Sequence, residues 1–282
     1  MRCRWIRTAQ PRHAGSADNP YAAPSHHAPN APLFAYATTV PGRIRKICRC
    51  YSPGHVHFGT RLAPVIGAIL PPPVLAEFRC ADAPEAPLFP AEEAAIAGAV
   101  AQRRREFATV RLCARQALAR LGEPAVPLVP GQRGAPCWPP GVVGSMTHCQ
   151  GYRAAAVARA AQVLALGIDA EPHGPLPRGV RQAVALPEEA AHLDELAAGY
   201  PDTHWDRLLF SAKESVYKAW YPLTGRWLGF ADARLVIDPD AGEFSATFRV
   251  PGARCGSREL TGFTGRWLVT DALVLTCVVV PG

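Results

Sequence analysis

The chain has 282 residues, of which 49% are hydrophobic and 19% charged, proportions that exclude a disordered protein and indicate a folded one. Its formal net charge is +7, but residues 1–64 carry nine bases and one acid (9 − 1 = +8), and residues 65–282 carry 21 bases and 22 acids (21 − 22 = −1). A basic groove that binds nucleic acid along the whole fold is therefore not expected.

Residues 1–64 are rich in Pro, Ala, His and Arg and show no sustained helical or strand period. They are interpreted either as a disordered extension or as sequence upstream of the true start. We favour a start at Val65, because the regular hydrophobic pattern begins there. Two cysteines and two histidines in this segment could bind zinc: Cys48, Cys50, His55 and His57. Zinc is not favoured, because the spacing matches no familiar finger and no hydrophobic pattern frames it.

The cysteines and the hydropathy indicate that the protein is located in the cytoplasm. Nine cysteines are scattered without a C-x-x-C pair, which is typical of reduced thiols in the cytoplasm. The basic N-terminus is not followed by the apolar run of a secretory signal. The longest late apolar run, Leu273–Val280, is too short to span a bilayer and is interpreted as a buried strand. We therefore expect a cytoplasmic protein without a membrane partner.

The first ordered part, residues 65–165, is predicted to combine strands with a long helical segment. Two strand-like runs, Ile66–Leu70 and Val74–Phe78, flank a proline turn. A helix follows from Pro90 to about Leu121, in one piece or two. Val142–His148 is predicted to begin a strand, and two later runs are predicted to be strands of one antiparallel sheet: Arg153–Arg159 and Ala165–Asp169.

The second part, residues 166–282, repeats this mixture. Helices are predicted over Pro187–Ala198 and Trp205–Trp220. Four strands are expected to complete a second sheet: Leu235–Ile237, Phe244–Val250, Arg266–Val269 and Leu273–Val280. The fold class is therefore α+β, a pseudo-twofold pair of similar subdomains, each with a small antiparallel sheet packed with helices.

Two carboxylates follow an apolar run near residue 165. In the segment Gly167–Glu171, Asp169 and Glu171 point to the same side of an extended chain, about 7 Å apart. Hard oxygen ligands at this spacing suit a divalent cation such as Mg²⁺. The alternative is an ordinary solvated strand edge.

The helix over Trp205–Trp220 carries a second group of polar residues. Glu214 and Lys218 share a face with the aromatic residues Phe210 and Tyr217. The simplest interpretation is a surface ion pair four residues apart, worth about 0.3–0.5 kcal/mol. The aromatic neighbours favour instead a partly buried carboxylate, which needs a metal or a cation to remain ionised.

A third group follows a Pro/Gly-rich loop. Ser145, Thr147 and His148 lie on one predicted strand, where hydroxyl, imidazole and backbone donors could hold a phosphate. Five arginines lie upstream on the first long helix: Arg103, Arg104, Arg105, Arg111 and Arg115. These arginines are about equally compatible with phosphate binding and with a solvated basic face. A lone histidine in the position of His148 is more often structural.

Together the three groups resemble the 4'-phosphopantetheinyl transferases, specifically the larger, monomeric bacterial type. The family's motifs occur in order at Gly144–His148, Gly167–Glu171 and Phe210–Ala219. Flanking stretches also match, at Arg103–Phe107, Pro136–Pro139 and Trp227–Phe230. The resemblance covers about residues 65–280 and does not extend to residues 1–64.

The resemblance implies an enzyme that uses coenzyme A and Mg²⁺. It would transfer the phosphopantetheine arm to a serine of an acyl or peptidyl carrier protein and release adenosine 3',5'-bisphosphate. Such carriers serve siderophore, polyketide, peptide or fatty-acid synthesis. The two-part architecture of the family implies a monomer.

The resemblance also implies a role for individual residues. Asp169, Glu171 and Glu214 would hold the cation, and Glu214 would also take the proton of the incoming serine. Lys213 and Lys218 would offset charge on the pyrophosphate, with Lys218 also counted as catalytic. Four residues would bind the nucleotide end of coenzyme A: Arg103, Arg111 and His148 at the 3'-phosphate and Ser145 nearby.

The sequence departs from the family at one loop position and leaves two alternatives open. Pro130 stands where the family often has a basic residue, and Arg133 is a substitute. One alternative is a non-catalytic protein of the same fold that binds coenzyme A and carrier protein. It is disfavoured because all three carboxylates and both lysines are present. The other, a nucleic-acid binder acting through residues 1–64, lacks any recognisable module.

Overall fold

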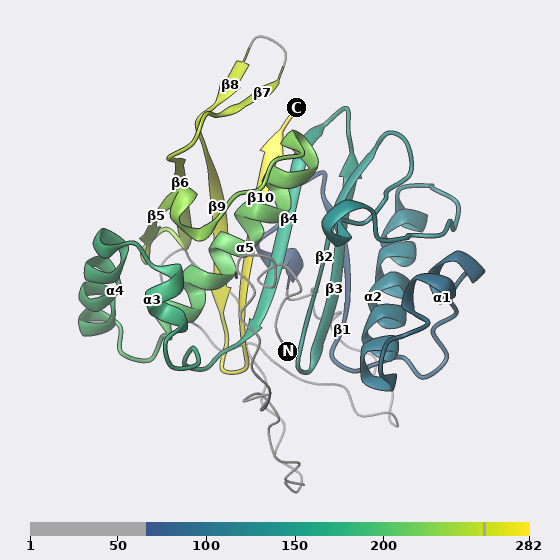
Figure 1. Cartoon of the computed structure of the whole chain (residues 1–282), viewed down its shortest axis with the longest axis horizontal. Helices are drawn as coiled ribbons and strands as arrows, with labels where there is room; N and C mark the ends of the chain where they lie inside the picture. The colour runs from purple at the N-terminus through teal and green to yellow at the C-terminus, as the bar shows by residue number, and fades with distance from the viewer. Residues whose placement is uncertain (1–65, 256–257) are drawn as a thin grey trace, which may run out of the picture.

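The computed structural model describes residues 66–255 and 258–282. The predicted extension 1–64, the start proposed at Val65 and the four zinc-ligand candidates all lie outside these residues. Within them, the structure confirms the α+β class: two antiparallel sheets, each packed with helices, stand side by side (Figure 1).

The first sheet has three strands in the order β1-β3-β2, with helix α2 packed on β1 and β3. The elements of this half are η2 (Ile66–Ala68), β1 (Leu75–Arg79), α1 (Pro90–Ile96), α2 (Ala101–Arg120), η3 (Gln132–Gly134), β2 (Val142–Cys149) and β3 (Tyr152–Arg159). The predicted long helix is thus two helices, because Val100, the residue that precedes α2, has an extended backbone conformation.

The prediction of a strand at Ile66–Leu70 is wrong. The chain forms a 3₁₀ turn there, Ile66–Ala68, in which Ile66 and Ile69 are both buried. Apolar residues three apart lie on the same side of a 3₁₀ turn. A short apolar run is therefore compatible with a helical turn as well as with a strand.

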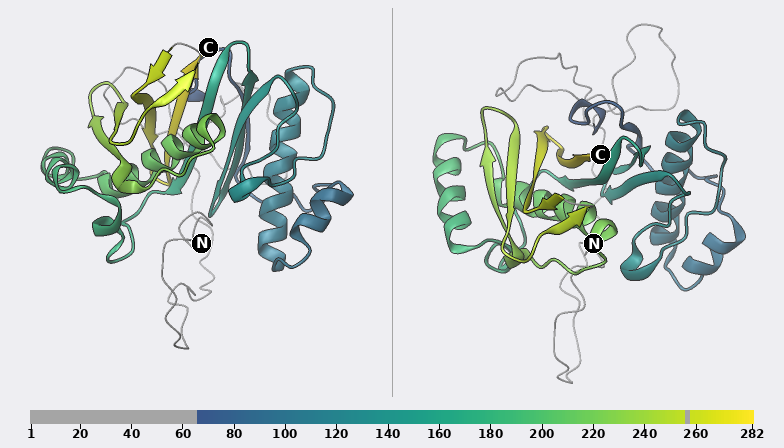
Figure 2. Two further views of the ribbon diagram at one scale, coloured as in Figure 1. Left: turned by 45° about the horizontal axis from the view of Figure 1, so that its top comes forward. Right: turned by 90° about the horizontal axis from the view of Figure 1, so that it is seen from above.

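The second sheet has five strands in the order β4-β10-β9-β6-β5, and helix α5 lies across β4 and β10 (Figure 1). Its elements are β4 (Val163–Pro172), α3 (Val180–Val184), α4 (Pro187–Gly199), α5 (Trp205–Thr224), η4 (Phe230–Asp232), β5 (Ala233–Asp238), β6 (Glu243–Phe248), β9 (Gly262–Val269) and β10 (Leu273–Pro281). A separate two-stranded ribbon, β7 (Ala253–Cys255) with β8 (Arg258–Leu260), extends from this sheet. The two views of Figure 2 show α4 on the outer side of one half and α1 and α2 on the outer side of the other, with α5 near the middle of the molecule.

The prediction that β4 shares a sheet with β3 is also wrong. β4 pairs antiparallel with β10, placing Asp169 opposite Thr276. β2 meets β4 through side chains: the Ile168 N–H donates to Ser145 Oγ and the Ala170 N–H to Thr147 Oγ1, both at 3.0 Å. β4 is almost wholly buried, so its continuous apolar run does not reveal which strand is its partner.

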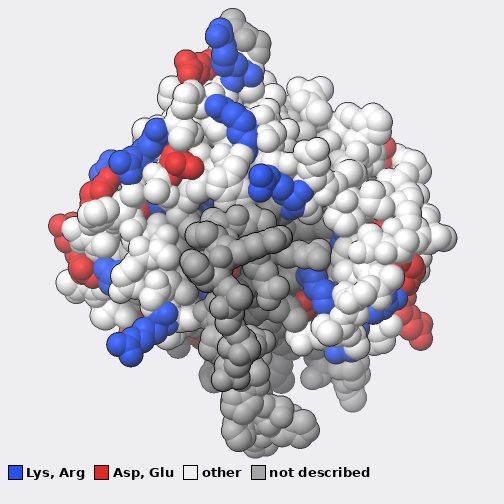
Figure 3. Space-filling model, viewed as in Figure 1, with Lys and Arg blue, Asp and Glu red and all other residues white. Residues whose placement is uncertain are grey.

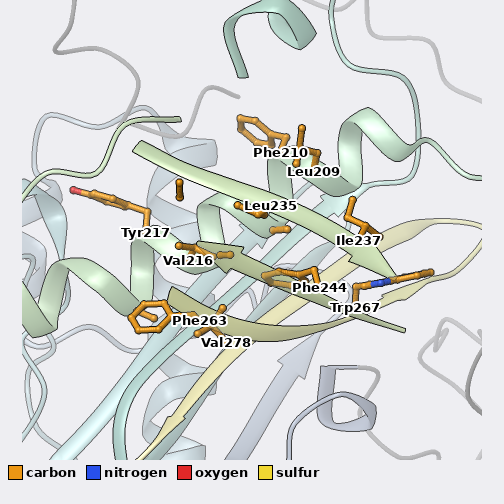
Figure 4. Packing of buried hydrophobic residues seen from close by; sticks show 14 of the residues in the cluster. Leu209, Phe210, Val216, Tyr217, Leu235, Ile237, Phe244, Phe263, Trp267 and Val278 are labelled. Atoms are coloured by element: carbon orange, nitrogen blue, oxygen red, sulfur yellow. The ribbon is translucent and has the colours of Figure 1, made fainter. Parts of the chain in front are cut away.

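One hydrophobic core fixes α5 against the second sheet. Side chains from α5 and from strands β5, β6 and β9 interlock, among them Leu209, Val216, Leu235, Phe244 and Trp267 (Figure 4). This packing holds the polar residues of α5 in fixed positions relative to β4. Among the described residues, no helix is both long and apolar enough to cross a lipid bilayer.

Candidate active site

Asp169 is the most firmly held polar residue of the β4–α5 contact. Its carboxylate is buried, and Oδ1 accepts hydrogen bonds from Lys218 Nζ at 2.7 Å and from Thr147 Oγ1 at 3.2 Å. Oδ2 accepts from Ser211 Oγ at 2.8 Å. Three donors from two elements, α5 and β2, fix both oxygens. Carboxylate oxygens with further lone pairs remain able to bind a cation.

Glu171 lies two residues further along β4, on the same side of the strand. Its Oε2 accepts a hydrogen bond from Arg207 Nη1 at 2.9 Å. Burial raises the pKa of Glu171 most, the negative charge of Asp169 raises it further, and Arg207 lowers it. A divalent cation between the two carboxylates would relieve this repulsion, so the donor set has the chemistry that Mg²⁺ requires.

Helix α5 supplies the other two predicted active-site residues. Glu214 is buried on α5, and Lys218 lies one turn further on. The Lys218 ammonium donates to the Ile168 carbonyl oxygen at 3.1 Å as well as to Asp169. The structure therefore brings Lys218 and Asp169 together, a pair that was not predicted from the sequence.

The three predicted metal ligands do not form a closed ligand shell by themselves. Within residues 66–255 and 258–282, no three Asp, Glu, His or Cys side chains are gathered closely enough to enclose a metal ion. Asp169 and Glu171 supply adjacent carboxylates on β4, and Glu214 comes from the facing helix. Further oxygen ligands would have to come from a bound molecule or water, as is usual for Mg²⁺.

Lys213 is placed differently from Lys218. Its buried ammonium donates to Glu189 Oε2 at 2.7 Å and to the carbonyl oxygens of Phe230, at 2.7 Å, and Ala233, at 3.1 Å. An ammonium group has three donors, and these contacts use all three. Burial lowers the pKa of Lys213, and Glu189 opposes that change. In this structure the Lys213 ammonium is therefore directed to protein acceptors. The resemblance implied instead that it offsets charge on the pyrophosphate.

Arg103 and His148 form a second polar cluster where α2 passes the end of β2. Arg103 Nη1 contacts His148 Nε2 directly. Burial, followed by the charges of Arg103, Lys218 and Arg153, lowers the pKa of His148 to about 3. His148 is therefore neutral, and the positive charge of this cluster comes from arginine.

Glu106 anchors this cluster and was not singled out from the sequence. Its buried carboxylate lies 3.8 Å from Arg103 Nη1, 3.7 Å from His148 Nδ1 and 3.6 Å from Arg153 Nη2. The sequence signal was an acid within the run Arg103–Phe107, one helical turn from Arg103. Only the tertiary structure shows that three cationic or imidazole groups share it.

Two of the residues predicted to bind the nucleotide end of coenzyme A make contacts within the protein instead. Arg111 is buried, donates from Nε to the Leu128 carbonyl oxygen at 2.8 Å and lies over the Phe107 ring at 3.1 Å. Burial lowers the pKa of Arg111 to about 9. Ser145 is used at the β2–β4 contact, where it accepts the Ile168 N–H. Neither side chain is presented to a ligand in this structure.

A mainly apolar cavity of about 320 Å³ adjoins Glu214. Tyr217, Trp227 and Phe230 line it together with Lys213 and the backbone near Gly229. The Arg133 guanidinium lies 5.2 Å from the centre of the Trp227 ring. The substitute cation expected in the Pro/Gly-rich loop is therefore beside a cavity-lining residue, and the cavity has the size for an extended organic chain.

Comparisons with known proteins identify the family of this chain. Residues 91–158 match the model of the 4'-phosphopantetheinyl transferase N-terminal domain, and residues 165–270 match that of the 4'-phosphopantetheinyl transferase superfamily. The chain is 60% identical over 219 residues to 4'-phosphopantetheinyl transferase Svp of Streptomyces mobaraensis, covering 77% of this chain and 89% of that protein.

Two further relatives extend the comparison. The chain is 46% identical over 223 residues to 4'-phosphopantetheinyl transferase PptT of Mycobacterium tuberculosis, covering 76% of this chain and 97% of that protein. It is 51% identical over 197 residues to 4'-phosphopantetheinyl transferase Npt of Nocardia iowensis, covering 67% and 87%. The chain therefore belongs to the 4'-phosphopantetheinyl transferase superfamily and transfers the 4'-phosphopantetheine arm of coenzyme A to carrier proteins.

Proposed function

We propose that the transfer takes place at the β4–α5 contact, with Mg²⁺ held by Asp169, Glu171 and Glu214. The observation that carries the proposal is the carboxylate of Asp169, fixed by three donors beside the charge of Glu171. When bound, the cation would neutralise charge on the pyrophosphate of coenzyme A. Phosphoryl transfer needs mostly such neutralisation and correct positioning.

In the reaction, the carrier serine oxygen forms a bond to the β-phosphorus of the pyrophosphate. The bond from that phosphorus to the bridging oxygen breaks, and adenosine 3',5'-bisphosphate leaves. Glu214 takes the serine proton, directly or through a water molecule. Lys218 lies within hydrogen-bond distance of Asp169 and offsets charge as the leaving group forms.

The Arg103–His148 cluster is the proposed site for the 3'-phosphate. Arg103 supplies charge and neutral His148 supplies a hydrogen bond, while Glu106 positions both. Arg111 and Ser145 support this region from inside, since both are committed to backbone contacts. Arg133 is a second cation for the ligand, near the cavity.

The cavity beside Glu214 is the proposed place for the pantetheine arm. Its aromatic walls suit the arm's methyl groups, and Glu214, which lines it, would place one end of an occupant near a carboxylate. We further propose a monomer acting in the cytoplasm, where the six cysteines found free among the described residues would stay reduced.

Carrier-protein loading tests the site. Asp169→Asn and Glu214→Gln should each lower kcat/KM for Mg²⁺-dependent loading by about 100-fold or more, because each removes a charge that faces the reacting phosphate. Circular dichroism should show an unchanged fold. Loading is read as the mass increase of a carrier incubated with coenzyme A. Glu195→Gln, an exposed acid on α4, is the matched control and should load normally.

Normal loading by Asp169→Asn or Glu214→Gln would contradict the site. The wild-type chain tests the non-catalytic alternative in the same assay. If fatty-acid, polyketide and peptide carriers all fail to gain mass, a protein that binds without turnover is favoured instead.

A further inference from the structure

The two halves of the molecule follow the same order of elements. Each has an edge strand, a helix with proline at its start, a long helix and a final hairpin: β1, α1, α2 and β2–β3 in one half, and β4, α4, α5 and β9–β10 in the other. The sheet order β1-β3-β2 corresponds to β4-β10-β9 (Figure 1). β1 and β4 are therefore equivalent strands, and α2 and α5 are equivalent helices.

The equivalence reaches individual hydrogen bonds at the start of α1 and α4. Glu92 is the third residue of α1: Oε2 accepts the Phe89 N–H at 2.9 Å, and Oε1 accepts the Leu128 N–H at 2.8 Å. Arg115 of α2 pairs with the same carboxylate at 3.0 Å.

Glu189 of α4 repeats this arrangement. Its Oε2 accepts the Leu186 N–H at 2.7 Å, its Oε1 accepts the Leu235 N–H at 2.7 Å, and Lys213 of α5 pairs with it. Lys213 is thus the counterpart of Arg115, which explains why its ammonium is directed to Glu189.

The spacing that pairs Arg115 with Lys213 also pairs Arg120 with the active-site lysine, Lys218. Arg120 of α2 donates to the Ala76 carbonyl oxygen at 3.1 Å and to Glu77 Oε1 at 2.7 Å. Lys218 of α5 donates to the Ile168 carbonyl oxygen at 3.1 Å and to Asp169 Oδ1 at 2.7 Å. Glu77 of β1 is therefore the counterpart of Asp169.

This alignment fixes the counterparts of the remaining two carboxylates. Glu171 follows Asp169 by two residues, and Arg79 follows Glu77 by two. Glu214 follows Lys213, and Gln116 follows Arg115. Across the β1–α2 contact, Arg79 Nη2 donates to Gln116 Oε1 at 3.4 Å.

We propose that the β1–α2 contact is a disarmed copy of the cation site, in which the guanidinium of Arg79 takes the place of the metal ion. Resting on the proposed function, the four aligned positions of the active copy hold three acids and one base, net −2, which a divalent cation offsets. Arg207, which pairs with Glu171 from outside these positions, leaves the active copy net negative. The N-terminal copy consists of Glu77, Arg79, Gln116 and Arg120, one acid and two bases, net +1. It therefore repels a divalent cation, and the chain has one cation site although its fold provides two places for one.

Replacing two residues should restore cation binding to the N-terminal copy, giving a rearmed chain. Arg79→Glu with Gln116→Glu gives this group three acids and one base, the composition of the active site. Mn²⁺ is the probe, and loss of the free-ion electron paramagnetic resonance signal measures its binding to the full chain. The parent is Asp169→Asn/Glu214→Gln, in which the C-terminal site is disabled. We expect the rearmed parent to bind one additional Mn²⁺ per chain, at least tenfold more tightly than the parent binds any.

The matched control puts the same two changes on a surface outside both contacts, as Arg178→Glu/Gln182→Glu, and should give no tight site. Equal binding by rearmed and control chains would overturn the proposal. If the rearmed chain unfolds by circular dichroism, the milder Arg79→Gln/Gln116→Glu replaces it, and absence of any gain there also overturns it. Failure of the proposed function would show separately, as undiminished Mn²⁺ binding in the parent relative to the wild type.

Discussion

At the scale of single residues, the surroundings of each polar side chain in the site determine its role. Asp169 accepts hydrogen bonds from three side-chain donors, so its contacts are those of an acceptor. At His148, burial and the charge of Arg103 both disfavour the imidazolium. The result is a neutral hydrogen-bonding imidazole next to a permanently charged guanidinium. The proposed 3'-phosphate site therefore combines a neutral group and a charged group.

His148 should make stability depend on pH in a defined window. Its pKa falls from 6.5 in the unfolded chain to about 3 in the folded one. Between these values the unfolded chain binds the proton, so stability should fall as pH drops below about 6.5, by at most about 1.4 kcal/mol per pH unit. His148→Gln should flatten this slope in urea unfolding series at pH 7 to 4. An unchanged slope would contradict a neutral His148.

Lys213 offers a second residue-scale prediction. Lys213→Met leaves Glu189 buried without its cation and should lower the free energy of unfolding by about 3–5 kcal/mol, whereas the double change with Glu189→Gln should cost less. Urea unfolding measures both. The KM for coenzyme A of the folded enzyme should change little. A stable Lys213→Met variant with a greatly raised KM would instead support contact with the pyrophosphate.

At the scale of elements, a close backbone approach brings α5 against β4. A Cβ atom on Gly167 would lie 2.0 Å from the Ser215 carbonyl oxygen and 2.8 Å from the Ala219 nitrogen. Glycine at this position therefore sets the distance between the strand that carries Asp169 and the helix that carries Glu214. The G-I-D motif has a packing reason as well as a chemical one.

Gly167→Ala should therefore damage both stability and turnover. Because the new methyl group meets backbone atoms on α5, we expect a cost of about 1–3 kcal/mol or more in thermal or urea unfolding, with carrier loading reduced in the folded fraction. Gly98→Ala is the matched control, since a methyl group there would meet no other described residue, its chain neighbours aside, within 4 Å. Equal stability of the two variants would show that α5 can move away from β4 at little cost.

Most elements could be predicted from sequence, and the failures have physical reasons. Helices α4 and α5 have long periodic patterns and a proline or a polar residue near the start. The ribbon strands β7 and β8 and the five-residue α3 were missed, because three to five residues carry too little periodicity to be recognised. β4 was recognised as a strand but assigned to the wrong sheet, since a strand buried on both faces shows no preferred side.

At the scale of the whole molecule, the two sheets meet where β2 faces β4. Two hydroxyl side chains join these strands, and Thr147 also contacts Asp169, so the meeting place of the halves is part of the site. In Figure 3 the basic side chains of the visible face stand in separate groups among acidic ones. This distribution agrees with a near-neutral residue range 65–282 and with recognition by a few placed cations.

Removal of residues 1–64 should leave carrier loading unchanged within about twofold, because every proposed site residue lies within residues 66–282 and site geometry sets the rate. The formal net charge should change from +7 to −1, which isoelectric focusing detects. Parallel kinetics of the full chain and of a chain beginning at Val65 after an added methionine provide the measurement. A large loss of kcat/KM with an intact fold would assign residues 1–64 a part in the reaction.

The sequence by itself predicted the α+β class, because hydrophobic patterning distinguishes helices from strands. Its three motifs carried the resemblance that implied the family and the reactive residues. It did not distinguish Lys213 from Lys218, or Arg111 from Arg103. Only the tertiary structure decided those roles, since they depend on partners far away in the chain: Glu189 for Lys213 and Leu128 for Arg111. A local pattern fixes the direction of a side chain, whereas long-range packing decides which acceptors it meets.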